Sequence, residues 1–155
     1  VRNGRGLVAC RAFAAGELVC RLHGRVVGAR TVWRWWSVDP RRAANCIRFD
    51  AERYLDTSGG WGEFANHSCA PNAVIRRERG VLVLRAMRPI GPGTEVTHDY
   101  STCVGTDDVW RMRCNCGASA CRGVVGDVAS IPVQRLRRYL AVRGVPAFIV
   151  AGMDP

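Results

Sequence analysis

A chain of 155 residues in which 48% are hydrophobic has the length of one domain and enough apolar side chains to build a core. Its formal net charge is +10, and each of the 23 basic residues is an arginine. Such an excess of positive charge is typical of proteins that bind nucleic acid or another polyanion. The arginines are spread along the chain, however, and the absence of lysine is also typical of codon bias, so phosphate-backbone binding is a secondary interpretation.

The sequence also excludes two other classes. It contains no run of about 20 apolar residues, so we expect no membrane span. Residues 1–6 lack the apolar stretch of a secretory signal, so the expected location is cytoplasmic and an exported disulfide framework is not expected for the eight cysteines. Cys10, Cys20 and Cys46 stand singly and are predicted to be small core residues.

Short strands are the main element that the sequence predicts. Residues 18–22, 73–77 and 81–85 are aliphatic and bounded by glycine, proline or charged residues, as half-buried strands are. The last two flank a Glu-Arg-Gly turn and predict a hairpin. Residues 33–39 are rich in aromatic side chains without a clean period, so we assign them no element.

One helix is predicted near the C-terminus. Pro132 suits a first helical turn, and Gly144 and Pro146 provide a stop. Between them, apolar residues recur at helical spacing: Val133, Leu136, Tyr139 and Leu140. The sequence therefore predicts a strand-rich domain with long irregular connections and a C-terminal helix.

A Cys-x-Cys-x4-Cys array, formed by Cys114, Cys116 and Cys121, predicts a zinc site. Structural zinc takes four tetrahedral nitrogen or sulfur ligands, and thiolates close together on a turn can provide several of them. The array provides three ligands. The fourth must come from elsewhere, with Cys69, Cys103 and a histidine as the alternatives.

Three segments carry a family resemblance. Residues 4–9 read Gly-Arg-Gly-Leu-Val-Ala, residues 64–72 read Phe-Ala-Asn-His-Ser-Cys-Ala-Pro-Asn, and residues 93–100 read Gly-Thr-Glu-Val-Thr-His-Asp-Tyr. In this order, and followed by the cysteine array with its Arg-Gly at residues 122–123, they resemble the SET-domain protein lysine methyltransferases with a post-SET zinc segment. The compact chain is most similar to the small stand-alone SET proteins of bacteria.

The resemblance implies a mainly β fold. Several small curved, β-clip-like sheets would hold the second and third segments as they thread past each other in a pseudoknot, and a post-SET zinc segment and a short α-helix would follow. Chain threading is rare among proteins, so such a crossing is expected to assemble a site. The expected division is a SET domain at residues 1–103, a post-SET segment at 104–123, and a C-terminal extension with the helix at 124–155.

The resemblance also implies two cofactors, S-adenosyl-L-methionine and a structural Zn²⁺. The residues it assigns to the methyl donor are Gly4, Arg5, Gly6, Asn66, His67 and Tyr100. Glycine suits a close approach of the backbone to a ligand because it has no Cβ. The family takes its fourth zinc ligand from the signature cysteine, which implies the set Cys69, Cys114, Cys116 and Cys121 and a C-terminal segment that closes over the site.

The implied activity is N-methyl transfer to the ε-amine of a lysine in a protein or peptide. A free lysine has a pKa of about 10.4 and must lose a proton before it attacks, and burial beside a cationic sulfonium lowers that pKa. Tyr100 matches the catalytic tyrosine of the family and would orient the amine. Because the displacement forms no covalent enzyme intermediate, positioning and electrostatics are expected to provide most of the rate.

Several residues depart from the family pattern. His98 stands where many members have an aromatic residue that sets the degree of methylation, and Leu22 replaces a common tyrosine; both are candidates for the substrate pocket. Asn45 and Glu63 stand at positions where a second tyrosine and an arginine are common. Asp99 is expected to be structural. These departures leave the degree of methylation and the substrate open.

Two alternatives remain. The same fold could act on a non-protein amine or a peptide precursor, or the chain could be a non-catalytic, zinc-stabilised module that binds nucleic acid or protein. The charge of +10 favours an acidic or neutral protein, or one associated with nucleic acid, over a highly basic tail unless the groove is locally acidic. No membrane partner is expected. Steep salt dependence of nucleic-acid binding without methyl transfer would favour the binding module.

Overall fold

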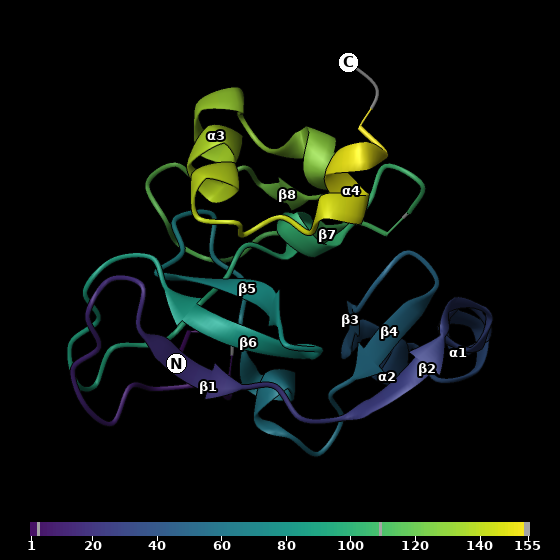
Figure 1. The fold of residues 1–155 in the computed structure, drawn as a ribbon, viewed down its shortest axis with the longest axis horizontal. Coiled ribbons are helices and arrows are strands. Elements are labelled where there is room, and N and C mark those ends of the chain that lie inside the picture. The colour runs from purple at the N-terminus through teal and green to yellow at the C-terminus, as the bar shows by residue number, and fades with distance from the viewer. Residues whose placement is uncertain (3, 109, 154–155) are drawn as a thin grey trace.

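The computed structural model describes residues 1–2, 4–108 and 110–153, and it is built from small antiparallel sheets and short helices (Figure 1). The strands are β1 Leu18–Arg21, β2 Arg25–Gly28, β3 Cys46–Arg48, β4 Arg53–Asp56, β5 Ala73–Glu78, β6 Val81–Ala86, β7 Met112–Arg113 and β8 Val124–Val125. The helices are α1 Ala29–Val38, α2 Pro40–Ala44, α3 Val133–Ala141 and α4 Ala147–Ala151, with single 3-10 turns at Trp61–Phe64, Tyr100–Cys103 and Val128–Ser130. The mainly β prediction is confirmed.

The first sheet has the strand order β1-β6-β5 and confirms the predicted hairpin. The turn is tighter than the sequence suggested, because Glu78 pairs with Val81 and only Arg79 and Gly80 connect the strands. Both turn residues have a positive φ, 47° and 81°, as in the two-residue turns whose twist matches that of antiparallel strands. Leu84 of this sheet is fully buried in the largest core cluster.

The second sheet, β2-β4-β3, packs against α1 and α2, which the sequence analysis did not predict. In α1 the side chains of Val32 and Trp35 are buried, whereas Trp33 is 57% exposed. Apolar side chains on the exposed face of α1, such as Trp33 and Val38, hide the helical period in the sequence. The start of α2 did carry a local signal, because the Asp39 side chain accepts a hydrogen bond from the Arg42 N–H and proline follows it.

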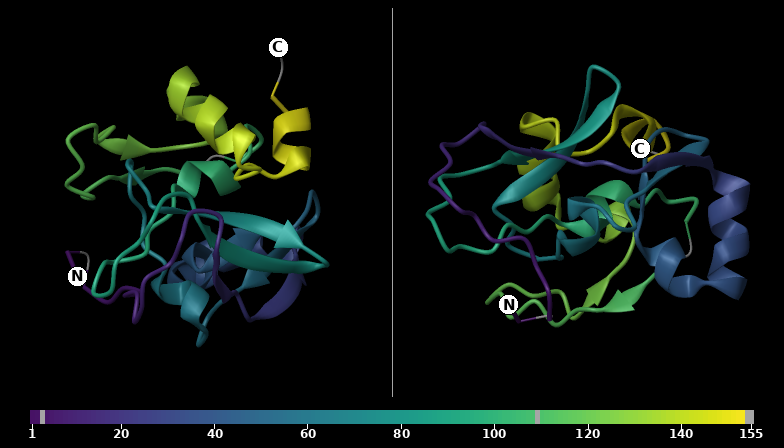
Figure 2. Two further views of the ribbon diagram at one scale, coloured as in Figure 1. Left: turned by 60° about the vertical axis from the view of Figure 1, so that its left-hand side comes forward. Right: turned by 90° about the horizontal axis from the view of Figure 1, so that it is seen from below.

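The C-terminal part forms a separate layer against the outer side of β5, seen from two directions in Figure 2. The predicted helix is confirmed as α3, with Tyr139 on its buried face. Val74 of β5 packs in one cluster with Tyr139 and Ile149, so this layer braces the first sheet. In the described part of the chain, no helix has the length and hydropathy that a membrane span requires.

Candidate active site and cysteine cluster

Two segments that are far apart in the sequence meet at the centre of the molecule. His67 and His98 form a parallel bridge. The Ser68 N–H donates to the His98 carbonyl at 3.0 Å, and the His98 N–H donates to the Asn66 carbonyl at 3.1 Å. The signature segment and the Asp-Tyr segment therefore lie side by side, as the resemblance implied.

The N-terminal segment runs alongside this crossing. The Leu7 N–H donates to the Phe64 carbonyl at 3.0 Å, and the Val96 N–H donates to the Leu7 carbonyl at 2.8 Å. These bonds hold residues 4–6 next to the signature segment.

Asn66 and Gly6 fit together closely. The side-chain amide of Asn66 donates to the Arg5 carbonyl at 2.8 Å and to the Glu95 carboxylate at 2.7 Å. A Cβ at position 6 would lie 2.9 Å from the Asn66 amide nitrogen and 2.6 Å from the Glu95 carboxylate oxygen, so a larger residue there would have to displace these side chains. Gly4 has a φ of +85°, which also favours glycine. The structure thus brings four of the predicted cofactor-binding residues into one place.

Tyr100 follows directly after the crossing. Its hydroxyl donates to the Ala65 carbonyl at 3.0 Å, and its N–H donates to Nδ1 of His67 at 3.2 Å. Burial raises the pKa of Tyr100 to about 12, so the phenol is neutral near pH 7. The ring lies 4.8 Å from that of His98 and 5.3 Å from that of His67, between ring centroids.

A narrow cavity of about 90 Å³ opens beside Tyr100. Its lining combines aromatic rings with two carboxylates: Trp36, Tyr54, His98, Tyr100 and Trp110, with Glu63 and Asp108. Apolar residues of α1 and α2, among them Val32 and Ala43, complete the walls. The cavity is therefore small and combines an apolar body with acidic groups.

His98 is the predicted pocket residue that the structure places in this cavity. It is 4% exposed, and within the described part of the chain its Nδ1 is buried without a hydrogen-bond partner. Burial, with a smaller contribution from His67, lowers the pKa of His98 to about 3, so the ring is neutral at physiological pH. A neutral imidazole with one unpaired nitrogen can bond a polar group that enters the cavity.

Only some of the remaining candidate pocket residues line this cavity. Asn45 lines the cavity, whereas Leu22 lies in the main core and is absent from the described lining. Of the tryptophans, Trp36 and Trp110 line the cavity. The sequence reasoning missed the contribution of α1 and α2, for which the capping pair at residues 39–40 was the available signal.

The cysteine array folds back onto the signature cysteine. The sulfur atoms of Cys69 and Cys114 are 3.7 Å apart, and the potential ligand atoms of Cys69, Cys114, Cys116 and His67 all lie within 4.8 Å of one another. Cys121 lies outside this group, and its thiol donates to the Cys114 carbonyl at 4.0 Å. The structure therefore gathers three of the four predicted metal ligands together with His67, and it places Cys121 next to Cys114.

Backbone N–H groups point at three of these sulfurs. The Arg122 N–H donates to Cys69, the Cys69 N–H to Cys116, and the Gly123 N–H to Cys121, each at 3.4 Å. Such donors stabilise thiolates, which are the metal-binding form of cysteine. Burial opposes the ionisation of Cys116, but hydrogen bonds from the Cys69 and Ala118 backbones lower its pKa to about 6.

The contacts of the His67 ring make it a poor candidate for a metal ligand. Nε2 lies 3.3 Å from the sulfur of Cys69, while Nδ1 accepts the Tyr100 N–H. An accepting Nδ1 requires the proton of the neutral ring to be on Nε2. His67 is then a hydrogen-bond donor to Cys69, and four sulfurs remain as the better ligand set.

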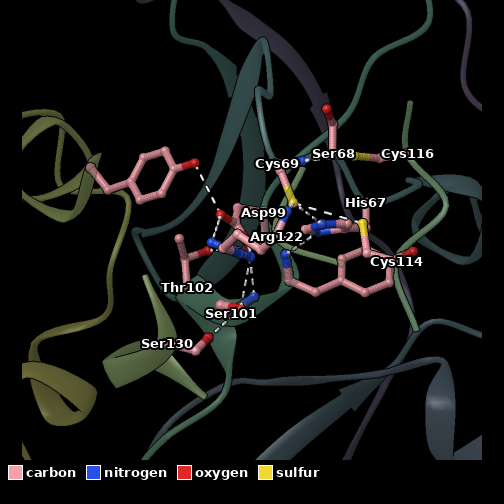
Figure 3. A network of polar contacts seen from close by, with 12 residues as sticks. His67, Ser68, Cys69, Asp99, Ser101, Thr102, Cys114, Cys116, Arg122 and Ser130 are labelled. Atoms are coloured by element: carbon pink, nitrogen blue, oxygen red, sulfur yellow. Dashed lines mark hydrogen bonds and ion pairs between the residues drawn. The ribbon is translucent and has the colours of Figure 1, made fainter. Parts of the chain in front are cut away.

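A buried carboxylate connects the site with the C-terminal layer (Figure 3). The side chain of Asp99 is fully buried and accepts two hydrogen bonds from the Arg122 guanidinium, at 2.7 and 2.8 Å. It also accepts the Tyr139 hydroxyl of α3 at 3.1 Å and the Ser101 N–H at 3.2 Å. The structural role expected for Asp99 thus extends to three parts of the chain.

Comparison with known proteins gives one consistent match. The family model described as "SET domain" matches residues 4–101. A "Histone-lysine N-methyltransferase, H3 lysine-4 specific" from Cryptococcus neoformans is 33% identical over 134 residues, which cover 78% of this chain and 9% of that protein. "Histone-lysine N-methyltransferase TRX1" from Oryza sativa subsp. japonica is 39% identical over 142 residues, which cover 81% and 13%.

A solved structure agrees with these sequence matches. The methyltransferase domain of human "Histone-lysine N-methyltransferase SETMAR" superposes with a TM-score of 0.62 at 26% identity, over 79% of this chain and 54% of that chain. The chain thus spans about a tenth of the length of the two curated relatives and about half of the solved domain.

The Asp99 network generates a stability prediction. Asp99→Asn removes the charge that balances the buried Arg122 guanidinium, so we expect the free energy of unfolding to fall by about 3–5 kcal/mol. Equilibrium denaturation in zinc-containing buffer measures the change. The matched control is Asp50→Asn, which weakens the exposed pair with Arg53 and should cost less than about 1 kcal/mol. Equal effects of the two substitutions would contradict the prediction.

Proposed function

The chain belongs to the SET-domain family, and we propose that it transfers a methyl group from S-adenosyl-L-methionine to the ε-amine of a lysine in a protein or peptide. The observation that carries this proposal is the position of the Tyr100 hydroxyl, at a narrow cavity and directly beside the crossing of the two family segments. The activity of the histone-lysine N-methyltransferase relatives supports it.

The residues around Gly6 fit the methyl donor. A Cβ at position 6 would crowd the side chains around it, so the surface at Gly6 is closely packed. The surface is also polar, because the side-chain amide of Asn66 bonds the Arg5 carbonyl there. Gly4, Arg5, Gly6, Asn66 and His67 would hold the donor, together with Tyr100. When bound, S-adenosyl-L-methionine supplies an activated methyl group on a sulfonium.

The chain's own contribution is to position and deprotonate the amine. The Tyr100 hydroxyl donates to the Ala65 carbonyl, which leaves its oxygen free to accept an N–H of the substrate amine. The rings of Trp36 and Trp110 exclude water from the alkyl chain of the lysine. Burial disfavours the ammonium form and so favours the neutral amine that attacks.

The carboxylates that line the cavity favour a positively charged substrate. Glu63 and Asp108 line it, although the chain as a whole carries a net charge of +10. A locally acidic entrance attracts a cationic side chain and relieves the repulsion expected for a basic peptide. A lysine within a basic segment, such as a histone tail, is therefore a suitable substrate, and a nucleic-acid-associated protein is the natural source of one.

We further propose a structural zinc site formed by Cys69, Cys114, Cys116 and Cys121. A tetrahedral site with Zn–S bonds of about 2.3 Å places sulfurs about 3.8 Å apart. The separation of 3.7 Å between Cys69 and Cys114 agrees with that geometry. Zinc here would join the segment after residue 110 to the signature segment.

The first prediction concerns catalysis. Tyr100→Phe removes the oxygen that positions the amine, so we expect methyl transfer to fall at least about 100-fold while binding of S-adenosyl-L-methionine is retained. Isotope-labelled donor incubated with a proteome lysate measures transfer, and the labelled bands identify the substrate by mass spectrometry. Label that persists at the wild-type rate would refute the role of Tyr100. Donor binding without any protein label would instead favour a non-protein amine.

The second prediction concerns the degree of methylation. The neutral His98 ring lines the cavity and can hold an N–H of the amine or a water molecule there, which leaves less room for a second methyl group. His98→Phe removes this polar ring, so we expect the product to shift from mainly monomethyl-lysine to di- and trimethyl-lysine. Mass spectrometry of a substrate peptide after single and multiple turnovers measures the shift. An unchanged product distribution would contradict the assignment.

The third prediction concerns zinc. Cys116→Ser removes one of the four sulfurs, so we expect the zinc content of the purified chain to fall well below one ion per chain and its melting temperature to drop. Cys10→Ser is the matched control, because Cys10 stands apart from the cluster and is exposed, so its prediction as a core residue was wrong. Elemental analysis and a thermal melt measure both effects, and a strong chelator should destabilise the wild type in the same way. Full zinc content in Cys116→Ser would exclude this ligand set.

A further inference from the structure

A second cavity, of about 710 Å³, lies between the β5–β6 hairpin, the end of β3 and the C-terminal helices. Its volume is in the range of roughly 300–1,000 Å³ that is typical of small-molecule sites. Among the described residues it shares no lining side chain with the cavity at Tyr100. It is therefore a separate site from the one proposed for methyl transfer.

The lining combines two kinds of side chain. Apolar residues include Phe49, Ile75, Leu140, Val145 and Phe148. Among them lie four guanidinium groups and one carboxylate: Arg48, Arg76, Arg77, Arg143 and Glu78. The lining thus has a positive charge in excess of its negative charge, next to a surface that favours apolar groups.

The carboxylate does not neutralise this charge. Glu78 accepts two hydrogen bonds from Arg85, at 2.6 and 2.7 Å, and its nearest oxygen is 4.0 Å from Arg76. Burial lowers the pKa of Arg76, and the positive charges of Arg85 and Arg143 lower it further. Glu78 raises this pKa, but the net shift is downward. The surroundings of the Arg76 cation therefore remain positively charged in spite of Glu78.

Two arginines at this cavity retain buried donors. Arg48 is 6% exposed, and it donates to the Tyr54 hydroxyl at 3.0 Å and to Asp107 at 3.2 Å. In the described part of the chain, the Nε atoms of both Arg48 and Arg76 are buried without a hydrogen-bond partner. Arg48 is thus held in the wall of the cavity by Tyr54 and Asp107, which leaves Arg76 and Arg143 as the cations free to meet an anionic ligand.

We propose that this cavity binds an organic phosphate of nucleotide size. The guanidinium fork matches the oxygens of a phosphate and bonds them more strongly than it bonds neutral acceptors. An apolar or aromatic body attached to the phosphate would pack on the half-buried Phe148 and on Leu140. Inorganic phosphate would leave this apolar part of the cavity unfilled, and an uncharged ligand would leave the arginines unpaired.

Isothermal titration of the full chain with uridine monophosphate, uridine and inorganic phosphate tests this proposal. A uracil nucleotide is used because it shares neither the adenine nor the sulfonium of S-adenosyl-L-methionine, so the two sites are measured separately. We expect the nucleotide to bind at least about tenfold more tightly than either uridine or phosphate. Uridine or phosphate binding as tightly as the nucleotide would overturn the proposal, as would absence of nucleotide binding.

Variants locate the site. We expect Arg76→Gln and Arg143→Gln each to weaken nucleotide binding about tenfold or more, as loss of a charge-assisted hydrogen bond does. Arg143 is exposed, so its replacement should leave the melting temperature of the free chain unchanged. Arg137→Gln is the matched control, because Arg137 is exposed on α3 and does not line the cavity. An equal loss in Arg137→Gln would assign the binding to the general positive charge and overturn the proposal.

Discussion

The buried carboxylate of Asp99 is the interaction on which the arrangement of the site depends. It joins the residue before Tyr100 to Arg122 of the cysteine segment and to Tyr139 of the C-terminal helix, and it lies 3.6 Å from the ring of His67. Removing two charges from water is costly, and an apolar replacement of such a pair is often equally stable. What a bidentate pair of this kind adds is a fixed position. Here it fixes Asp99, which precedes the proposed catalytic Tyr100, relative to the segments that contain Arg122 and Tyr139.

The cysteine cluster holds the same segment as the Asp99–Arg122 ion pair, because Cys121 directly precedes Arg122. Cys121 and Arg122 are consecutive, so the metal site proposed here and the ion pair with Asp99 would hold the same turn by different chemistry. The Arg122 backbone also donates to the sulfur of Cys69. Because Cys69 lies two residues from His67, and His67 accepts the Tyr100 N–H, each of these groups limits the movement of the others. Loss of one should therefore disturb more than its own contact.

The distribution of charge separates two cavities of opposite character. A net charge of +10 alone suggests a partner of negative charge, but the cavity at Tyr100 is lined by Glu63 and Asp108. The cavity beside the C-terminal helices contains most of the clustered arginines described here, including Arg48 and Arg76. A cationic lysine and an organic phosphate could therefore be bound by the same small protein without competition, because charge acts locally when water and salt screen it.

Features that depend on neighbouring residues could be predicted from the amino-acid sequence. These are the hairpin of residues 73–86, the helix that begins at Val133, the close spacing of the cysteines and the ordered family motifs. Tertiary structure alone decided which distant groups meet. It made α1 a wall of the cavity, placed Leu22 in the core, paired Asp99 with Arg122, and left one nitrogen of His98 unpaired. The physical reason is that propensity and periodicity act within a few residues, whereas burial and ion pairing depend on how the crossing brings remote segments together.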